Sequence, residues 1–413
     1  MLAFTAATLL TPQAALDHAL LLVERGRVVD VVARSAREIP PDISPIDFGS
    51  HVIAPGYLDL HIHGSAGHDV MDDSPDALPA IERLLARHGV TSYLPTTVTA
   101  PMDPTLRALE RLADAIEAHE AARRKTHDDW HEPKTSKSSR SAGPLDGGPL
   151  AGRAQPLGIH LEGPFISHAR RGVHSPEFLL PPRLETFECL WQAARGRIRM
   201  MTIAPELDGA LELIAAASAR GVCVSLGHSD GDFAATERAI SAGARHATHT
   251  FNAMRPLSHR DPGIVGAVLS DERVTADLIA DGVHLDPAIV KLVAKAKGLE
   301  RIVLITDAIS ATGMPDGRYP LGSMEVDVKN GRCESGGKLA GSVLTMDRAV
   351  RNLVSFAEWD LPTAAAAASR NPARVLGSNN KGVLAAGADA DFIVLDRDGN
   401  VIRTFIAGLE SRL

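Results

Sequence analysis

Eight short apolar segments run through the middle of this chain, each followed by a longer stretch of helical or irregular character. We predict strands at Val52–Leu60, Ser92–Val98, Leu157–Leu161, Met200–Ala204, Cys223–Leu226, His246–Thr250, Ala276–Ala280 and Ile302–Thr306. The helical spacing of apolar residues predicts helices at Ala77–His88, Thr105–Arg124, Gly209–Arg220, Phe233–Ala242, Pro287–Lys297 and Val343–Phe356. Alternating strands and helices imply a parallel sheet, and eight repeats favour an α/β fold of the closed (β/α)8 TIM-barrel type.

The main alternative to a barrel is an open, doubly wound sheet. That fold would require a glycine-rich phosphate loop after its first strand. Here His61 and His63 stand at that position instead. We therefore favour the barrel, in which polar residues at the ends of the strands gather at one mouth.

Both ends of the chain have the alternating pattern of β-hairpins. The first hairpin pairs Ala19–Val23 with Val28–Val32 around a turn at Arg25-Gly26. The second pairs Asp391–Leu395 with Val401–Ile406 around a turn at Asp398-Gly399. We predict a small β-sandwich domain built from residues 1–53 and 375–413, and a barrel built from residues 54–374. Charged residues followed by glycines and prolines fill residues 124–155, which predicts a flexible insertion within the barrel.

The composition narrows the class of protein. The 413 residues carry a formal net charge of −8, which argues against a general binder of nucleic acid or membrane surfaces. No apolar run approaches the roughly 20 residues of a membrane span, and the first residues lack the order of a signal peptide. The three cysteines (Cys189, Cys223 and Cys333) form neither a disulfide framework nor a CxxC zinc motif. We therefore expect a cytoplasmic protein.

His61 and His63 directly follow the first predicted strand and are separated by one residue. Their side chains therefore point to the same face of the strand, where two imidazoles can chelate a cation. Asp59 lies on the same face, and we expect it to orient one of these histidines through a hydrogen bond. Taken alone, the pair is equally well read as two polar residues at a strand end.

Three further potential ligands follow later strands. Glu162 ends the third, His228 follows the fifth, and His249 lies at the end of the sixth. One carboxylate with two imidazoles leaves a coordination position open for water, as in a catalytic zinc site. Asp307 follows the eighth strand, where a carboxylate can accept a proton from the attacking water and deliver it to a leaving amine. The set predicts a metal-dependent hydrolase of amides or related bonds.

The motifs together resemble those of N-acetylglucosamine-6-phosphate deacetylases, a family of the amidohydrolase superfamily. The segments that carry the resemblance are Pro55–Gly64, His160–Phe165, Gly227–Ser229, Thr248–Met254, Asp281–His284, Thr306–Ala308 and Leu339–Ser342. They span nearly the whole chain. His-Leu-Glu-Gly-Pro and His-Thr-Phe-Asn-Ala-Met are especially characteristic of the family.

The resemblance implies a role for each matching residue. Glu162, His228 and His249 match the principal metal ligands, and Asp307 matches the catalytic acid and base. Five residues match positions that contact the substrate. His174 matches a residue at the scissile amide, Asn252 and Ala253 match residues at the phosphate, and His284 matches a further contact. Arg260 matches an arginine that reaches the phosphate from the neighbouring subunit of a homodimer. His61 and His63, which some family members lack, allow a second metal bridged through Glu162. Zinc is the expected ion, in one or two copies, with iron as the alternative.

The expected reaction is hydrolysis of N-acetylglucosamine 6-phosphate to glucosamine 6-phosphate and acetate. The N-acetylgalactosamine 6-phosphate epimer is an alternative substrate, because the orientation of one hydroxyl is not visible in a sequence. Cyclic-amide hydrolases of the dihydroorotase or hydantoinase type are a further alternative, but they normally use a carbamylated lysine where this chain has Glu162. A non-catalytic barrel would be expected to have lost some of these residues, and all are present.

Overall fold

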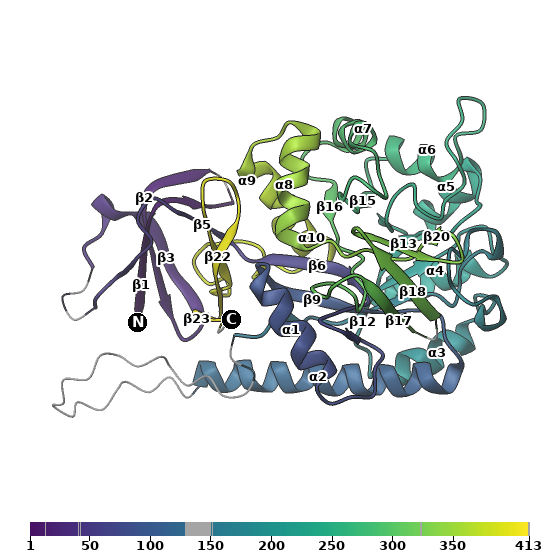
Figure 1. Cartoon of the computed structure of the whole chain (residues 1–413), viewed down its shortest axis with the longest axis horizontal. Coiled ribbons are helices and arrows are strands. Elements are labelled where there is room, and N and C mark those ends of the chain that lie inside the picture. The colour runs from purple at the N-terminus through teal and green to yellow at the C-terminus, as the bar shows by residue number, and fades with distance from the viewer. Residues whose placement is uncertain are drawn as a thin grey trace.

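A computed structural model describes residues 1–12, 14–39, 41, 43–128, 150, 152–322 and 324–411. Figure 1 shows a small sheet at one end of the molecule, next to a larger body of strands surrounded by helices. Both labelled chain ends lie beside the small sheet. No helix among the described residues combines the length and the apolar character needed to cross a membrane.

The larger body is the predicted barrel. Its parallel strands are β6 (Tyr57–Ile62), β9 (Val90–Thr97), β11 (Ile159–Glu162), β12 (Ile198–Ile203), β13 (Cys223–Leu226), β14 (His246–Ala247), β15 (Thr275–Leu278) and β16 (Ile302–Leu304), with the short β10 (Gln155–Pro156) beside β9. All eight predicted strand positions are thus confirmed. The first and last strands meet through an Ile62–Ala308 bridge and a 2.9 Å hydrogen bond from Asp307 N to His61 O.

Helices pack around the barrel strands. They are α1 (Ala77–Arg87), α2 (Met102–Asp128), α3 (Leu184–Ala193), α4 (Ala210–Ala219), α5 (Phe233–Ala242), α6 (Gly263–Ser270), α7 (Pro287–Lys297), α8 (Met346–Ala357), α9 (Leu361–Ala367) and α10 (Arg370–Val375). Short 3-10 turns occupy Arg34–Ala36, His168–Arg170 and Pro176–Phe178. The six predicted helices are present. Of the four that were not predicted, α6, α9 and α10 have at most eight residues, too few for a clear helical period.

The small sheet uses both ends of the chain, as predicted. It contains β1 (Leu2–Leu10), β2 (Ala15–Glu24), β3 (Arg27–Ala33), β4 (Ile46–Asp47), β5 (Val52–Pro55), β21 (Phe392–Leu395), β22 (Val401–Ile406) and β23 (Leu409–Glu410). The order β23-β22-β21-β5-β1-β2-β3 makes it one continuous sheet. The sheet curls around an aromatic core, since the ring of Phe4 on β1 lies 4.9 Å from that of Phe392, two strands away.

The predicted strand Val52–Leu60 belongs to two sheets. Its first part is β5 of the small sheet, and its second part is β6 of the barrel. The chain passes between them at Gly56, where a Cβ atom would lie 2.3 Å from the side chain of Thr91. Only glycine fits so close an approach, so this residue joins the two bodies without a linker.

Two small sheets that were not predicted flank the mouth of the barrel. One contains β17 (Gly317–Leu321), β18 (Met324–Lys329), β19 (Arg332–Ser335) and β20 (Lys338–Leu339), and the other contains β7 (Gly64–Ser65) and β8 (His68–Asp69). The larger one buries an apolar cluster that includes Val98 and Ile309, close to the ends of β9 and β16. It therefore covers one side of the mouth.

The structure corrects the start of the predicted insertion. Helix α2 continues to Asp128, so residues 124–128 are helical rather than part of a flexible loop, and Gln155 already belongs to β10. The return to the barrel is anchored, since Arg153 Nη2 lies 2.7 Å from Glu82 Oε2. The rest of the predicted insertion, residues 129–149 and 151, lies outside the described part of the chain.

A buried charge network joins helix α2 to the small sheet. Asp391 accepts hydrogen bonds from Arg123 (3.0 Å), Lys381 (2.6 Å) and the main-chain N–H of Ala407 (2.8 Å). Asp389 lies 3.0 Å from Arg123 and 3.1 Å from Lys381. Burial alone would raise the pKa of Asp391, but the two cations hold it well below its ordinary value.

We predict that Asp391→Asn lowers the free energy of unfolding by about 3–5 kcal/mol, because it removes one of the two buried carboxylates that balance Arg123 and Lys381. The depressed pKa means that the carboxylate stabilises the fold above pH 3.8 and ceases to do so as the pH falls below that value. The difference between the two proteins, measured by denaturant unfolding, should therefore shrink in acid. Asp398→Asn, on an exposed turn, should change stability by less than about 0.5 kcal/mol, and an equal effect of the two substitutions would contradict the prediction.

Candidate metal centre

The polar residues that follow the barrel strands converge at one mouth of the barrel. They come from five strand ends, and all are buried. They are His61 and His63 at β6, Glu162 at β11, His228 after β13, His249 after β14, and Asp307 after β16. The predicted gathering of these side chains is therefore observed.

The carboxylate of Glu162 lies at the centre of the group. Its Oε1 is 3.0 Å from Nε2 of both His228 and His249. Its Oε2 is 3.2 Å from Nε2 of His63 and 3.5 Å from Nε2 of His61. One carboxylate thus faces two pairs of imidazoles, one pair with each oxygen.

Asp307 faces the first pair of histidines. Its Oδ1 lies 3.3 Å from Nε2 of His63 and 3.5 Å from Nε2 of His61. Burial alone would raise the pKa of this carboxyl group, but the neighbouring histidines His61, His63 and His249 hold it well below its ordinary value. Asp307 is therefore an ionised base at neutral pH.

The same balance sets the charge of the other groups. Burial acts to raise the pKa of Glu162, but His61, His174 and His228 hold it well below its ordinary value. Burial lowers the pKa of His228 to about 4, although Glu162 opposes the shift. Burial acts to lower the pKa of His63 and His249, but Glu162 and Asp307 raise both above the ordinary value. The centre thus has anionic carboxylates and a neutral imidazole at His228, and the neutral ring is the form of histidine that a metal ion binds.

The donor set fits divalent metal ions. Nε2 of His61 lies 3.1 Å from Nε2 of His63, and the same distance separates Nε2 of His228 and His249. Two nitrogens bound to one tetrahedral zinc at about 2.0–2.1 Å are about 3.3 Å apart, so both pairs have the spacing of ligands to a shared cation. Histidine nitrogens with carboxylate oxygens are also the donors that zinc and iron accept.

Main-chain carbonyls fix the orientation of two of these histidines. Nδ1 of His63 donates to Thr96 O (2.9 Å), and Nδ1 of His228 donates to Arg170 O (3.0 Å). A carbonyl can only accept, so each Nδ1 carries a hydrogen, and in the neutral ring each Nε2 then presents a lone pair to the centre. Neither Thr96 nor Arg170 was singled out from the sequence, because a main-chain contact depends only on the fold.

Asp59 has a different role from the one expected. It does not bind a histidine ring. Its Oδ2 accepts a 2.5 Å hydrogen bond from Thr306 Oγ1, and its Oδ1 lies 3.2 Å from Thr306 N and 3.3 Å from the main-chain nitrogen of His61. Asp59 therefore ties the first barrel strand to the end of the last, and holds His61 and Asp307 only through the main chain.

Three of the other predicted residues lie close to this centre. His174 is buried, with Nε2 3.5 Å from Glu162 Oε2. Asn252 donates to His249 O (3.2 Å), and Ala253 O accepts from Ser229 N (3.1 Å), so both lie on the turn that follows β14.

His284 and Arg260 lie on two other loops. His284 donates a hydrogen bond from Nδ1 to Asp281 Oδ2 (2.7 Å), so its Nε2 does not take part in this bond. Arg260 is exposed and makes no hydrogen bond or ion pair with any described residue. The structure therefore does not connect Arg260 to the metal centre within one chain.

The main chain is strained around the centre. Positive φ angles occur at His228 (47°), His249 (28°), Phe251 (79°), Ala253 (50°) and Asp307 (49°), none of which is glycine. Such angles cost free energy and persist where the surrounding structure enforces them, commonly at functional sites. Three of these residues were predicted as metal or proton-transfer groups, and strain in this place supports a functional use of the turns.

Comparison with known proteins agrees with this geometry. Residues 150–410 match the model of the amidohydrolase family. The chain is 39% identical over 398 residues to the N-acetylgalactosamine-6-phosphate deacetylase of Escherichia coli O157:H7, with 94% of this chain and 96% of that protein covered. It is 37% identical over 402 residues to the human N-acetylglucosamine-6-phosphate deacetylase, with 94% and 90% covered.

A solved structure matches the whole chain. A substituted variant of N-acetyl-D-glucosamine-6-phosphate deacetylase from Mycobacterium smegmatis, in complex with N-acetyl-D-glucosamine-6-phosphate, superposes with a TM-score of 0.86 at 35% identity, covering 100% of this chain and 99% of that one. The barrel, the buried ligand cluster and the family match define a metal-dependent hydrolase of the amidohydrolase class. Within that class, the chain belongs to the N-acetylglucosamine-6-phosphate deacetylase family.

We predict that Glu162→Gln weakens binding of the divalent metal by more than about 10-fold. Loss of a group that only orients a metal ligand already lowers metal affinity by about 10-fold or more, and Glu162 is expected to bind the metal directly. The neutral amide removes the negative charge that faces all four histidines. Metal content after gel filtration, measured by mass spectrometry, checks this. Glu177→Gln, at an exposed position in the following loop, is the matched control, and full metal content in Glu162→Gln would show that this carboxylate is not a ligand.

Proposed function

We propose that this protein hydrolyses the acetamide of N-acetyl-D-glucosamine 6-phosphate to D-glucosamine 6-phosphate and acetate. The observation that carries the proposal is the position of Glu162 between two pairs of histidines, with Asp307 beside one pair. A metal-binding cluster with a carboxylate base beside it is the arrangement that hydrolysis of an amide requires. The assignment of the sugar phosphate rests on the relatives that act on it.

The ligands divide into two sets. His228 and His249 face Oε1 of Glu162, and His61 and His63 face Oε2. We infer that His228, His249 and Glu162 would hold one divalent ion and that His61, His63 and Glu162 would hold a second, with zinc as the ion and iron as the alternative. A divalent cation bound here supplies Lewis acidity to the attacking water and to the acyl oxygen.

The side chains of this chain supply the rest of the reaction. Asp307, ionised at neutral pH, takes the proton from the water as its oxygen attacks the acetyl carbon. His174 donates a hydrogen bond to the acyl oxygen as negative charge develops there. Protonated Asp307 then gives its proton to the amide nitrogen, the bond between carbon and nitrogen breaks, and acetate and the free amine leave.

The sugar phosphate requires contacts beyond the metal centre. We assign Asn252, Ala253 and His284 to the substrate, since they lie on turns that follow β14 and β15. We propose that Arg260 binds the phosphate of the substrate that occupies the neighbouring subunit of a homodimer. Its exposure, and its lack of a partner among the described residues, support this assignment, and a guanidinium forms strong paired hydrogen bonds with phosphate.

The N-acetylgalactosamine 6-phosphate epimer is the second candidate substrate. One relative at 39% identity is a deacetylase of that sugar phosphate. Cyclic-amide substrates are disfavoured, because a glutamate stands where those hydrolases carry a carbamylated lysine. We also place the protein in the cytoplasm, since its three cysteines are free thiols, as a reducing compartment requires.

Acetate release tests the proposal directly. We expect turnover of N-acetylglucosamine 6-phosphate, loss of turnover on chelation, and recovery with a divalent metal. The unphosphorylated sugar should react poorly, because it lacks the anion that Arg260 binds. Preferred turnover of the galactosamine epimer would move the assignment to the second candidate, and no turnover of any of the three by metal-loaded protein would refute it.

A mixing experiment tests the shared site. Asp307→Asn should fold and bind metal but lose most of its turnover, and Arg260→Ala should bind the phosphorylated substrate weakly. In a co-expressed hybrid dimer, the Asp307→Asn subunit supplies Arg260 to the intact centre of its partner. We expect about a quarter of wild-type activity from an equal mixture, as random pairing of a two-fold dimer predicts. Activity no higher than the mean of the two separate variants would contradict the shared site.

A further inference from the structure

Thr99, which follows strand β9, contacts the imidazole of His174 with its main-chain N–H and its hydroxyl. Its main-chain nitrogen lies 3.3 Å from Nδ1 of the imidazole, and its Oγ1 lies 2.8 Å from the same atom. A main-chain N–H can only donate, so Nδ1 of His174 accepts and carries no hydrogen. In the neutral ring the hydrogen is then on Nε2, which lies 3.5 Å from Glu162 Oε2.

This arrangement is opposite to that of two metal-facing histidines. His63 and His228 each direct Nδ1 at a main-chain carbonyl, which places a lone pair on Nε2. His174 directs Nδ1 at a donor, which places a hydrogen on Nε2. All three Nε2 atoms lie close to the Glu162 carboxylate. The group that contacts Nδ1 therefore decides what Nε2 can do. A carbonyl at Nδ1 leaves Nε2 able to bind a metal, and a donor at Nδ1 makes Nε2 a hydrogen-bond donor.

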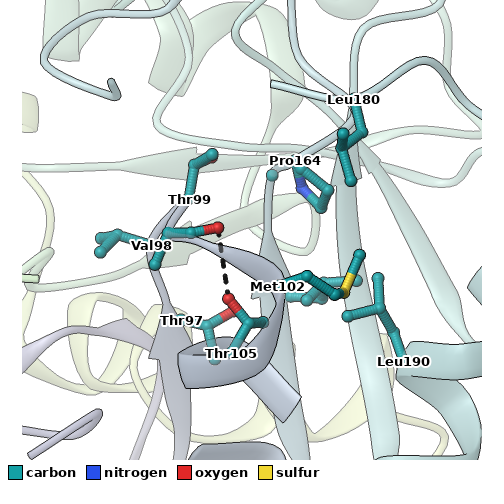
Figure 2. Close-up of a pocket in the computed structure, with 11 residues that line it drawn as sticks. Thr97, Val98, Thr99, Met102, Thr105, Pro164, Leu180 and Leu190 are labelled. Carbon is teal, nitrogen blue, oxygen red and sulfur yellow. Dashed lines mark hydrogen bonds between the residues drawn. The ribbon is translucent and has the colours of Figure 1, made fainter. Parts of the chain in front are cut away.

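Packing holds the Thr99 side chain in place. A Cβ atom at residue 163 would lie 2.1 Å from Thr99 Oγ1, and Gly163 has a φ of 77°, which also favours glycine. Figure 2 shows Thr99 and Pro164 at the edge of a small cavity that Leu180 and Met102 also line. The hydroxyl thus occupies space that the Glu-Gly-Pro turn leaves open for it.

We propose that Thr99 is a positioning residue that holds His174 in its Nε2–H form, so that this group can donate to the acyl oxygen of the substrate. The proposal rests on the proposed function for the identity of that oxygen. The hydroxyl is the part that substitution can remove, because the main-chain N–H remains in any variant. Thr99 therefore acts through His174 and does not touch the substrate.

Thr99→Val tests this role with little change of shape. We expect kcat to fall by about 10- to 100-fold, the usual cost of losing a group that orients a functional histidine, while KM changes by less than about 3-fold. Thr99→Ser, which restores the hydroxyl, should recover most of the rate. Thr97→Val is the matched control, since Thr97 lines the same cavity and its buried Oγ1 has no hydrogen-bond partner within the described chain.

A double-mutant cycle separates positioning from a general structural effect. In a His174→Gln background, Thr99→Val should change kcat by less than about 2-fold, because the residue it acts through is gone. The same fold-change in both backgrounds, or a rate for Thr99→Val equal to that of Thr97→Val, would overturn the proposal.

Nitrogen-15 NMR of the histidine side chains gives a result that does not depend on turnover. In metal-loaded protein, the signal that disappears in His174→Gln should show the hydrogen on Nε2, and in Thr99→Val that signal should shift toward the other tautomer or broaden. If the wild-type protein turns over none of the sugar phosphates, the proposed function fails, and this spectrum alone decides the role of Thr99. A hydrogen on Nδ1 of His174 in the wild-type protein would refute it.

Discussion

The buried carboxylate of Glu162 is the interaction on which the rest of the site depends. A carboxylate removed from water is costly unless it is paired, and here each oxygen faces its own pair of imidazoles at 3.0–3.5 Å. This balance requires four histidines from three strand ends to meet at one point. A closed parallel barrel provides that meeting point, because all its strands end at the same mouth.

The mouth is held by groups that take no part in the proposed chemistry. Asp59 and Thr306 join the first and last strands, and a hydroxyl network below the centre links Thr202 to His160 and to Thr248, each at 2.8 Å. These contacts are buried and satisfied, so they stabilise the barrel where the turns above it are strained. The positive φ of Asp307 and its neighbours is tolerated because the strands beneath them are firmly joined.

Much of this could be predicted from the sequence, because strand-end residues in a parallel barrel must come together. His61, Glu162 and Asp307 were located from that rule alone. The sheet β17–β20 was missed because its position depends on apolar contacts with Val98, which is far away in the chain, and with Ile309 at the mouth of the barrel. The partner of Asp59 and the tautomer of His174 were also out of reach. Both are set by atoms of distant segments, and a sequence gives residue types but not which donor faces which acceptor.

The strand order of the small sheet has a consequence for synthesis of the chain. Strand β5 pairs with β1 on one side and with β21 on the other. More than three hundred residues separate β5 from β21, so the ribosome must complete all the barrel strands before that second edge is covered. Until then the nascent chain presents an open, apolar strand edge beside a folding barrel, which is a site for wrong pairing or for a chaperone. A strand made after the barrel therefore covers the edge of a strand made before it.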